Sequence, residues 1–211
     1  MKKPLNKLFL LFVIFSFPLF AMEFEKIVFE NDEISINVPK EWELLSNSLT
    51  KEINKFSAEI LNKNSYPSYN KTTLLAINAR PSPANAVIRL NILAPLDYTQ
   101  ADLANMTKKE LAQVSLEIRE MFMKTMHKEF KKLGLEPLMV YDTKIIKNNA
   151  KYAMLITYLR KGSNDSIWLV SQFKFPNDKK GYLIELTLSQ NLEKGDFYNP
   201  ILMQVLKSLK F

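Results

Sequence analysis

The sequence predicts an α+β protein, a three-layer α/β/α sandwich around a mostly antiparallel sheet. Segments with strand character and segments with helical periodicity follow the order ββ-α-ββ-α-ββββ-α. The last four strand segments are joined by short linkers, which favours antiparallel neighbours. Within residues 152–159, Tyr152 and Met154 alternate with Ala153 and Leu155, so both sides of the strand are apolar. A sheet with one wet face shows cleaner alternation, and helices are therefore expected on both faces.

The first 21 residues have the layout of a secretory signal peptide. Early lysines precede an apolar run, Leu8–Phe20, and Ala21 offers a small residue at the expected cleavage point. The run is shorter than the about 20 residues that a membrane-spanning helix needs. We therefore expect export to the periplasm or beyond, with residues 1–21 removed and residues 22–211 forming one globular domain without a membrane anchor. An uncleaved anchor and a buried N-terminal helix are the alternatives.

Composition excludes several classes of function. The chain has no cysteine, so it has no disulfide, no thiolate metal site, no thiol nucleophile and no cysteine-linked lipid anchor. The formal net charge of +7 includes the lysines of the leader, and the remaining charges are scattered. A nucleic-acid-binding protein shows a clustered basic stripe with stacking aromatics instead. We expect no nucleic-acid partner.

The chain after the leader begins with a predicted hairpin. Strands at Lys26–Glu30 and Ile34–Val38 flank a short polar turn. Pro39 ends the pairing because proline has no N–H to donate. Trp42 follows at once. Residues Asn47–Asn62 repeat apolar side chains at steps of three and four, which predicts an amphipathic helix.

The middle of the chain predicts a second strand pair and a long helix. The strands are Thr72–Ala79 and Ala86–Leu93, joined by a proline-containing connection. The stretch Gln100–Leu133 contains no proline or glycine and reads as helical. Its length exceeds that of a typical globular helix, so a break near Thr107 is an open alternative to one continuous helix.

The last third predicts four strands and a terminal helix. Turn-forming residues separate the strands, which are Leu138–Ile146, Lys151–Arg160, Ser166–Phe175 and Gly181–Ser189. The helix covers Phe197–Leu209. Its apolar side chains fall on one side, which is expected to face the sheet: Ile201, Leu202, Val205, Leu206 and Leu209.

Three phrases of the sequence resemble the PsbP-like superfamily, whose fold also includes a yeast Ran-GTPase-release factor. They are INVPKEWE at Ile36–Glu43, the strand GYLIELTLS at Gly181–Ser189, and the closing helix ILMQVLKSLKF at Ile201–Phe211. Members of this superfamily are mostly non-catalytic accessory subunits, GTPase-binding factors and exported bacterial proteins. The resemblance implies the sandwich fold and a protein-binding or accessory role. It also implies that Trp42 packs as a plug after the Val-Pro turn. It carries over no functional residue set.

Signatures of common enzymes are absent from the sequence. The chain has one histidine, His127, and four glycines, with no G-x-S-x-G elbow, phosphate-binding glycine loop or H-E-x-x-H helix. We therefore expect no enzymatic activity and no cofactor. Glu185 lies on the opposite side of its strand from Ile184 and Leu186. A structural salt bridge at the rim of the sheet is its expected role, and general acid–base work with a second carboxylate is the alternative.

A methionine-rich stretch of the long predicted helix offers a metal candidate. Met123, Met126 and His127 stand at i, i+3 and i+4, where thioethers and an imidazole suit Cu(I). Packing is the favoured interpretation, because these residues fall on different faces of the helix and methionine commonly fills gaps in cores. We therefore predict no metal, with Cu(I) as the alternative.

Two surfaces are candidates for contact with a partner. Tyr66 and Tyr69 lie in a polar loop, where binding residues are common. Leu116, Met123 and Phe130 step by seven along the helix and form a narrow apolar seam, which is covered either within the domain or by a partner. The sequence therefore predicts a non-catalytic exported protein that binds another protein or supports an envelope complex. A small-ligand or Cu(I)-binding module and a carboxylate-dependent hydrolase are the alternatives.

Overall fold

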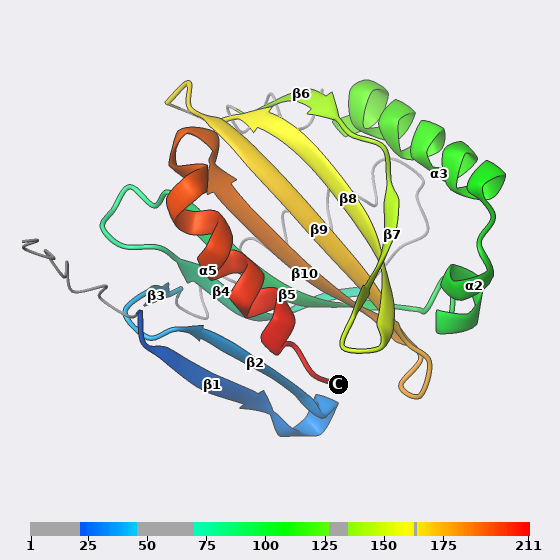
Figure 1. Ribbon diagram of the computed structural model, residues 1–211, viewed down its shortest axis with the longest axis horizontal. Helices are drawn as coiled ribbons and strands as arrows, with labels where there is room; N and C mark the ends of the chain where they lie inside the picture. The colour runs from blue at the N-terminus through cyan, green and yellow to red at the C-terminus, as the bar shows by residue number, and fades with distance from the viewer. Residues whose placement is uncertain (1–21, 46–69, 127–134, 163) are drawn as a thin grey trace, which may run out of the picture.

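The computed structural model describes residues 22–45, 70–126, 135–162 and 164–211. Within these residues the largest element is an eight-stranded sheet (Figure 1). Its strands are β3 (Glu43–Leu44), β4 (Asn70–Asn78), β5 (Ala86–Ala94), β6 (Glu136–Val140), β7 (Lys144–Asn148), β8 (Lys151–Lys161), β9 (Ile167–Asn177) and β10 (Tyr182–Asn191). They lie in the order β3-β4-β5-β10-β9-β8-β6, with β7 also paired to β8. All these pairs are antiparallel, which confirms the predicted sheet.

The predicted opening hairpin is confirmed and forms a separate two-stranded sheet. Strand β1 (Phe24–Phe29) pairs with β2 (Ile34–Pro39). The backbone of Ser35 exchanges two hydrogen bonds of 2.9 Å with Lys210, and the Asn37 N–H donates to Ser208 Oγ at 2.8 Å. These bonds fix the hairpin to the end of the chain, beside the last helix (Figure 1).

One face of the sheet is covered by this hairpin and by helix α5 (Gly195–Ser208) (Figure 1). The helix buries the side that the sequence predicts, through Leu202, Val205 and Leu206. Trp42 is 8% exposed and meets Tyr198 edge-to-face at 5.9 Å, which confirms its expected role as a plug. The strands supply the other half of this core, which includes Ile88, Leu90, Ile184, Leu186 and Phe175.

The opposite face carries the second helical layer, so the predicted α/β/α sandwich is confirmed. Helix α2 (Gln100–Asn105) and helix α3 (Lys108–Met121) are separated at Thr107, and a π-helical turn (Phe122–Met126) follows. The break near Thr107 is therefore confirmed over the described part of the long predicted helix. Each helix begins with a capping box, which satisfies N–H groups of its first turn. Together they cover a second apolar core: Leu103, Phe122, Val140, Met154, Ile156, Tyr158 and Val170.

The prediction of one strand over Leu138–Ile146 is wrong. The segment forms two strands, β6 and β7, on the same edge of β8. Between them the N–H of Tyr141 still donates to Thr157 O at 2.9 Å, but the N–H of Thr143 turns away and donates to Ser115 Oγ of α3 at 2.9 Å. A side chain on a distant helix thus takes one ladder bond and interrupts the strand. The helix predicted at Asn47–Asn62 lies outside the described residues.

Candidate functional site

Helix α5 covers only part of its face of the sheet. Antiparallel partners share a face, and the register pairs Leu155 with Phe173 and Leu159 with Leu169. Phe173 and Leu155 belong to the core under α5, so Leu159 and Leu169 continue the same face outward. Both are only half-buried. We call this surface the trough. It comprises Met139, Ile146, Leu155, Leu159, Ile167, Leu169, Phe173 and Met203.

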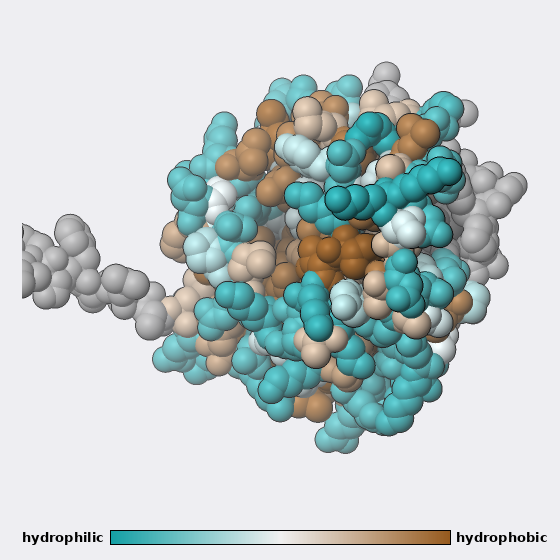
Figure 2. Space-filling model, turned by 45° about the vertical axis from the view of Figure 1, so that its right-hand side comes forward, coloured by the Kyte–Doolittle hydropathy of each residue, from teal (hydrophilic) through white to brown (hydrophobic). Residues whose placement is uncertain are grey.

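Three members of the trough are strongly exposed for apolar side chains. Met139 on β6 is 49% exposed, Ile167 on β9 is 40% exposed and Met203 on α5 is 37% exposed. Figure 2, which brings the β7 side of the molecule forward, shows apolar side chains gathered in a hollow among hydrophilic ones. Contiguous apolar surface with a polar rim is typical of an interaction site.

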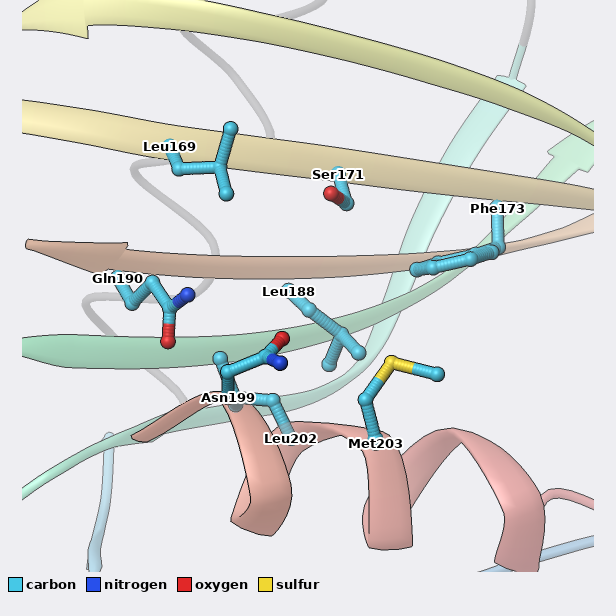
Figure 3. A pocket seen from close by; sticks show the side chains of 8 residues that line it. All are labelled: Leu169, Ser171, Phe173, Leu188, Gln190, Asn199, Leu202 and Met203. Carbon is cyan, nitrogen blue, oxygen red and sulfur yellow. The ribbon is translucent and has the colours of Figure 1, made fainter. Parts of the chain in front are cut away.

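The wall of the trough is built by α5. Asn199, Leu202 and Met203 point from the helix toward the side chains of β9 and β10 (Figure 3). They enclose a small cavity of about 30 Å³ with Leu169, Ser171, Phe173, Leu188 and Gln190. A space of this size holds about one water molecule. The buried side chain of Gln190 lines it, and its Oε1 has no hydrogen-bond partner in the described part of the chain.

Hydrogen bonds close the trough at one end. The Asn148 side-chain amide donates to Leu206 O at 2.9 Å, and that of Asn149 donates to Lys207 O at 2.7 Å. These bonds satisfy carbonyls in the last turn of α5, which have no partner within a helix. They tie the β7–β8 turn to the helix, and β7 and α5 separate from there toward β6 (Figure 1). The trough is therefore a wedge that opens toward β6.

A buried ionic network lies on the opposite face of the same strands. Glu185 is 4% exposed, and its carboxylate is 3.2 Å from Lys71 Nζ and 3.8 Å from Lys174 Nζ. The Asn91 amide donates to it at 3.0 Å. The expected salt bridge is present, but its position at the rim was wrong, because β10 is a central strand between β5 and β9.

Charge and hydrogen bonding decide the protonation state of Glu185. Burial alone raises the pKa of the carboxyl, but the charges of Lys71 and Lys174 and the hydrogen bonds from Lys71 and Asn91 outweigh it and lower the pKa below its usual value. The group therefore stays ionised at neutral pH, and its ionic partners are lysines and not a second carboxylate. This arrangement fits a structural ion pair better than a general acid.

The predicted site residues are only partly placed. Tyr66, Tyr69, His127 and Phe130 lie outside the described residues, as does the side chain of Met126. Leu116 is 47% exposed on α3 and Met123 is 46% exposed in the π-helical turn. The partner seam and the Cu(I) set therefore remain predictions. Within the described part of the chain, no cluster of three or more His, Asp or Glu side chains is arranged to hold a metal.

The trough was missed at the level of sequence. Its signal was present, because Leu155, Leu159 and Leu169 make their strands apolar on this side too. The same pattern predicts a surface covered by the chain's own helices. The described helices do not extend over it.

Comparison with known proteins defines the fold. No family model matches the chain, and no curated protein matches its sequence. The solution structure of the cyanobacterial PsbP protein CyanoP from Synechocystis is similar, with a TM-score of 0.52 and 13% identity over 92% of this chain and 95% of that one. LpqN of Mycobacterium tuberculosis, involved in cell envelope biogenesis, gives a TM-score of 0.46 at 14% identity, covering 89% of this chain and 90% of its own. The Ran-binding protein Mog1p of Saccharomyces cerevisiae gives 0.42 at 11% identity, covering 90% and 96%.

The likeness to CyanoP extends over nearly the whole of both chains. The chain has the PsbP-like fold, as its sequence phrases predicted.

Proposed function

We propose that this protein is an exported, non-catalytic binding protein, and that the trough takes up a segment of another protein. The observation that carries the proposal is the half-covered sheet face, where Met139, Ile167 and Met203 expose apolar surface beside α5. The cavity in the wall of the trough has a volume of about 30 Å³, far below the roughly 300–1,000 Å³ of small-molecule pockets. An open apolar strip of this kind favours a polypeptide over an enclosed ligand.

The dimensions favour a helix as the bound segment. The part of this face that no described helix covers spans β7, β8 and β9, and strands lie about 4.8 Å apart. A helix with its side chains is about 10 Å across, so one helix fits beside α5 and completes the layer. Lys144 shares this face with Leu155, is exposed, and forms no ion pair among the described residues. We expect an amphipathic partner helix with an acidic residue opposite Lys144.

Export is the second part of the proposal and depends on the leader. Residues 1–21 combine early lysines, an apolar run and Ala21. Within the described residues, no helix has the length and apolar character to cross a bilayer. Fractionation of cells that express the full chain tests this part. A periplasmic form that starts near Met22 is expected, and an uncleaved cytoplasmic form would contradict export.

Site-specific cross-linking tests the binding surface. A photo-cross-linking residue at position 203 of the full chain is expected to give a discrete adduct with an envelope protein, whereas the same residue at the exposed Val28 of β1 is not. The cross-linked partner segment, made as a peptide, should then bind the purified protein. Met203→Glu should weaken this binding by about tenfold or more. The substitution removes apolar surface that the peptide would bury and places a charge in the contact.

Two results would overturn the proposed surface. One is an equal adduct from positions 203 and 28, which indicates unspecific contact. The other is that Met203→Glu and the control variant Val28→Glu both bind the peptide with the affinity of the wild type.

A further inference from the structure

A second concave site lies between α3 and the break in the sheet edge. It is a groove of about 420 Å³, within the range of small-molecule sites. One wall is a continuous stripe of α3, and the other is the segment between β6 and β7. The lining residues are Lys108, Leu111, Ala112, Ser115, Leu116, Arg119, Asp142 and Thr143. We call it the α3 groove. It shares no residue with the trough.

The wall of the α3 groove holds a buried hydroxyl without a partner. Thr143 is 3% exposed, and its Oγ1 makes no hydrogen bond with any residue that the structure describes. Leaving a buried polar group unsatisfied costs about 1–3 kcal/mol, and native proteins do so rarely. Beside it, Ser115 Oγ accepts from the Thr143 N–H at 2.9 Å, which leaves its own proton to donate. Ser115 and Thr143 both line the groove, and each hydroxyl has a proton that it can donate to a ligand.

The charged groups of the groove are mostly donors as well. Arg119 Nη2 contacts Asp142 Oδ1 at 2.6 Å, and this single contact leaves the other guanidinium N–H groups free to donate. Lys108, on the first turn of α3, forms no ion pair among the described residues. With two cations and one carboxylate, the lining carries a net positive charge of one. One monoanion would neutralise it.

The rest of the lining is aliphatic. Leu111, Ala112 and Leu116 occupy the helix stripe between the two cations. Leu116 is 47% exposed, so the groove presents apolar surface to its contents. A ligand that satisfies both kinds of lining needs an acceptor head group and a hydrocarbon body.

We propose that the α3 groove binds a small monocarboxylate with an aliphatic chain. The carboxylate accepts from the Thr143 and Ser115 hydroxyls and pairs with Arg119, while the chain lies along Leu111 and Leu116. An alcohol of the same length lacks the charge, and a short carboxylate lacks the chain. This inference is independent of the proposed protein-binding function, because the two sites lie on different elements.

The inference is tested by titrating the whole purified protein with decanoate. Binding is measured by calorimetry and by the amide chemical shifts of the protein. Saturable binding is expected, with the shifts confined to α3 and residues 141–143. Decanol and acetate should each bind at least about tenfold more weakly, because each lacks one half of the interaction.

Thr143→Val is the decisive variant because valine has nearly the same shape and no hydroxyl. Since the hydroxyl has no partner in the unliganded protein, this change should leave the free energy of unfolding equal or higher. It should nevertheless raise the dissociation constant of decanoate by about tenfold. Thr143→Ser keeps the hydroxyl and should retain the affinity. Met203→Glu, in the trough, should bind as the wild type does.

Three outcomes overturn the inference. They are no saturable decanoate binding, equal affinity for decanoate and decanol, and unchanged affinity in Thr143→Val. Shifts that fall along β8 and β9 near Met203 would assign the ligand to the trough and also contradict it.

Discussion

On the face that carries α5, strands β5 and β10 are sealed, whereas β8 and β9 keep apolar side chains in contact with solvent. Ile88, Leu90, Ile184 and Leu186 are all 0% exposed beneath α5 and the hairpin. On the same face Ile167 is 40% exposed. The strands of both halves are apolar, so composition does not separate them. What differs is the cover. One sheet thus has a buried core in one half and an exposed apolar surface in the other.

Adjacent residues of α5 sharpen this comparison most strongly. Leu202 is 4% exposed and belongs to the buried core, whereas Met203 is 37% exposed over the trough. Leu202→Ala should lower the free energy of unfolding by about 3 kcal/mol, because it removes buried methyl groups and leaves a cavity. Met203→Ala should change it by less than about 0.5 kcal/mol. Denaturant unfolding measures both. Similar losses for the two variants would show that the trough is part of the core.

The Glu185 network lies on the opposite face of the sheet from α5. It should make the free energy of unfolding depend on pH. The pKa of Glu185 is lower in the folded protein than in the unfolded chain, so its contribution is full above the unfolded pKa of about 4.3 and disappears as pH falls through the folded pKa. Glu185→Gln should cost about 2 kcal/mol at pH 7, because two lysines lose their partner. In unfolding curves from pH 7 to pH 3, the difference in stability between wild type and variant should narrow as the pH falls, because protonation removes the charge that the variant lacks.

An exposed ion pair provides the control for that experiment. Glu33 pairs with Lys179 and Lys180 at the surface, and hydrogen bonds from both lysines lower its pKa as well. Glu33→Gln should have a much smaller effect at pH 7, because solvent screens exposed pairs. A pH-independent gap between wild type and Glu185→Gln would refute the ionic account of the network.

The smallest expected change in stability concerns α3, which covers the opposite face of the sheet. Ser115 is the only buried residue of α3. The stability of this helix therefore depends strongly on its capping interactions. Thr107→Ala removes the capping hydroxyl and should cost the helix about 1 kcal/mol, which accelerates amide exchange in α3 about fivefold. Exchange in β10 should not change. Thr99→Ala is the matched control, because it should affect α2 instead.

Much of the fold was predictable from local signals. The hairpin, the paired strands and the terminal helix follow from alternation, turn residues and helical periodicity, which act over a few residues. The break at Thr107 has its own local signal, a threonine followed three residues later by Glu110, which is the pattern of a capping box.

The candidate sites were less predictable, because they depend on contacts between distant residues. The interruption of the edge strand arises from Ser115, which lies 28 positions before Thr143. Alternation within residues 138–146 contains no trace of that bond. The central place of Glu185 likewise follows from the strand order, in which β10 lies beside β5.

The sequence by itself determined the class of fold, the absence of thiol chemistry and the apolar character of both strand faces, because these depend on residue types and short-range spacing. Only the tertiary structure decided which apolar face receives a cover and which stays open. That outcome depends on where α5 lies across the sheet. Its C-terminal end is held by the hairpin, through the bond from Asn37 to Ser208, and by Asn148 and Asn149 of the β7–β8 turn. The burial of a side chain depends on how the layers assemble, because the residues that cover it lie far away in the sequence.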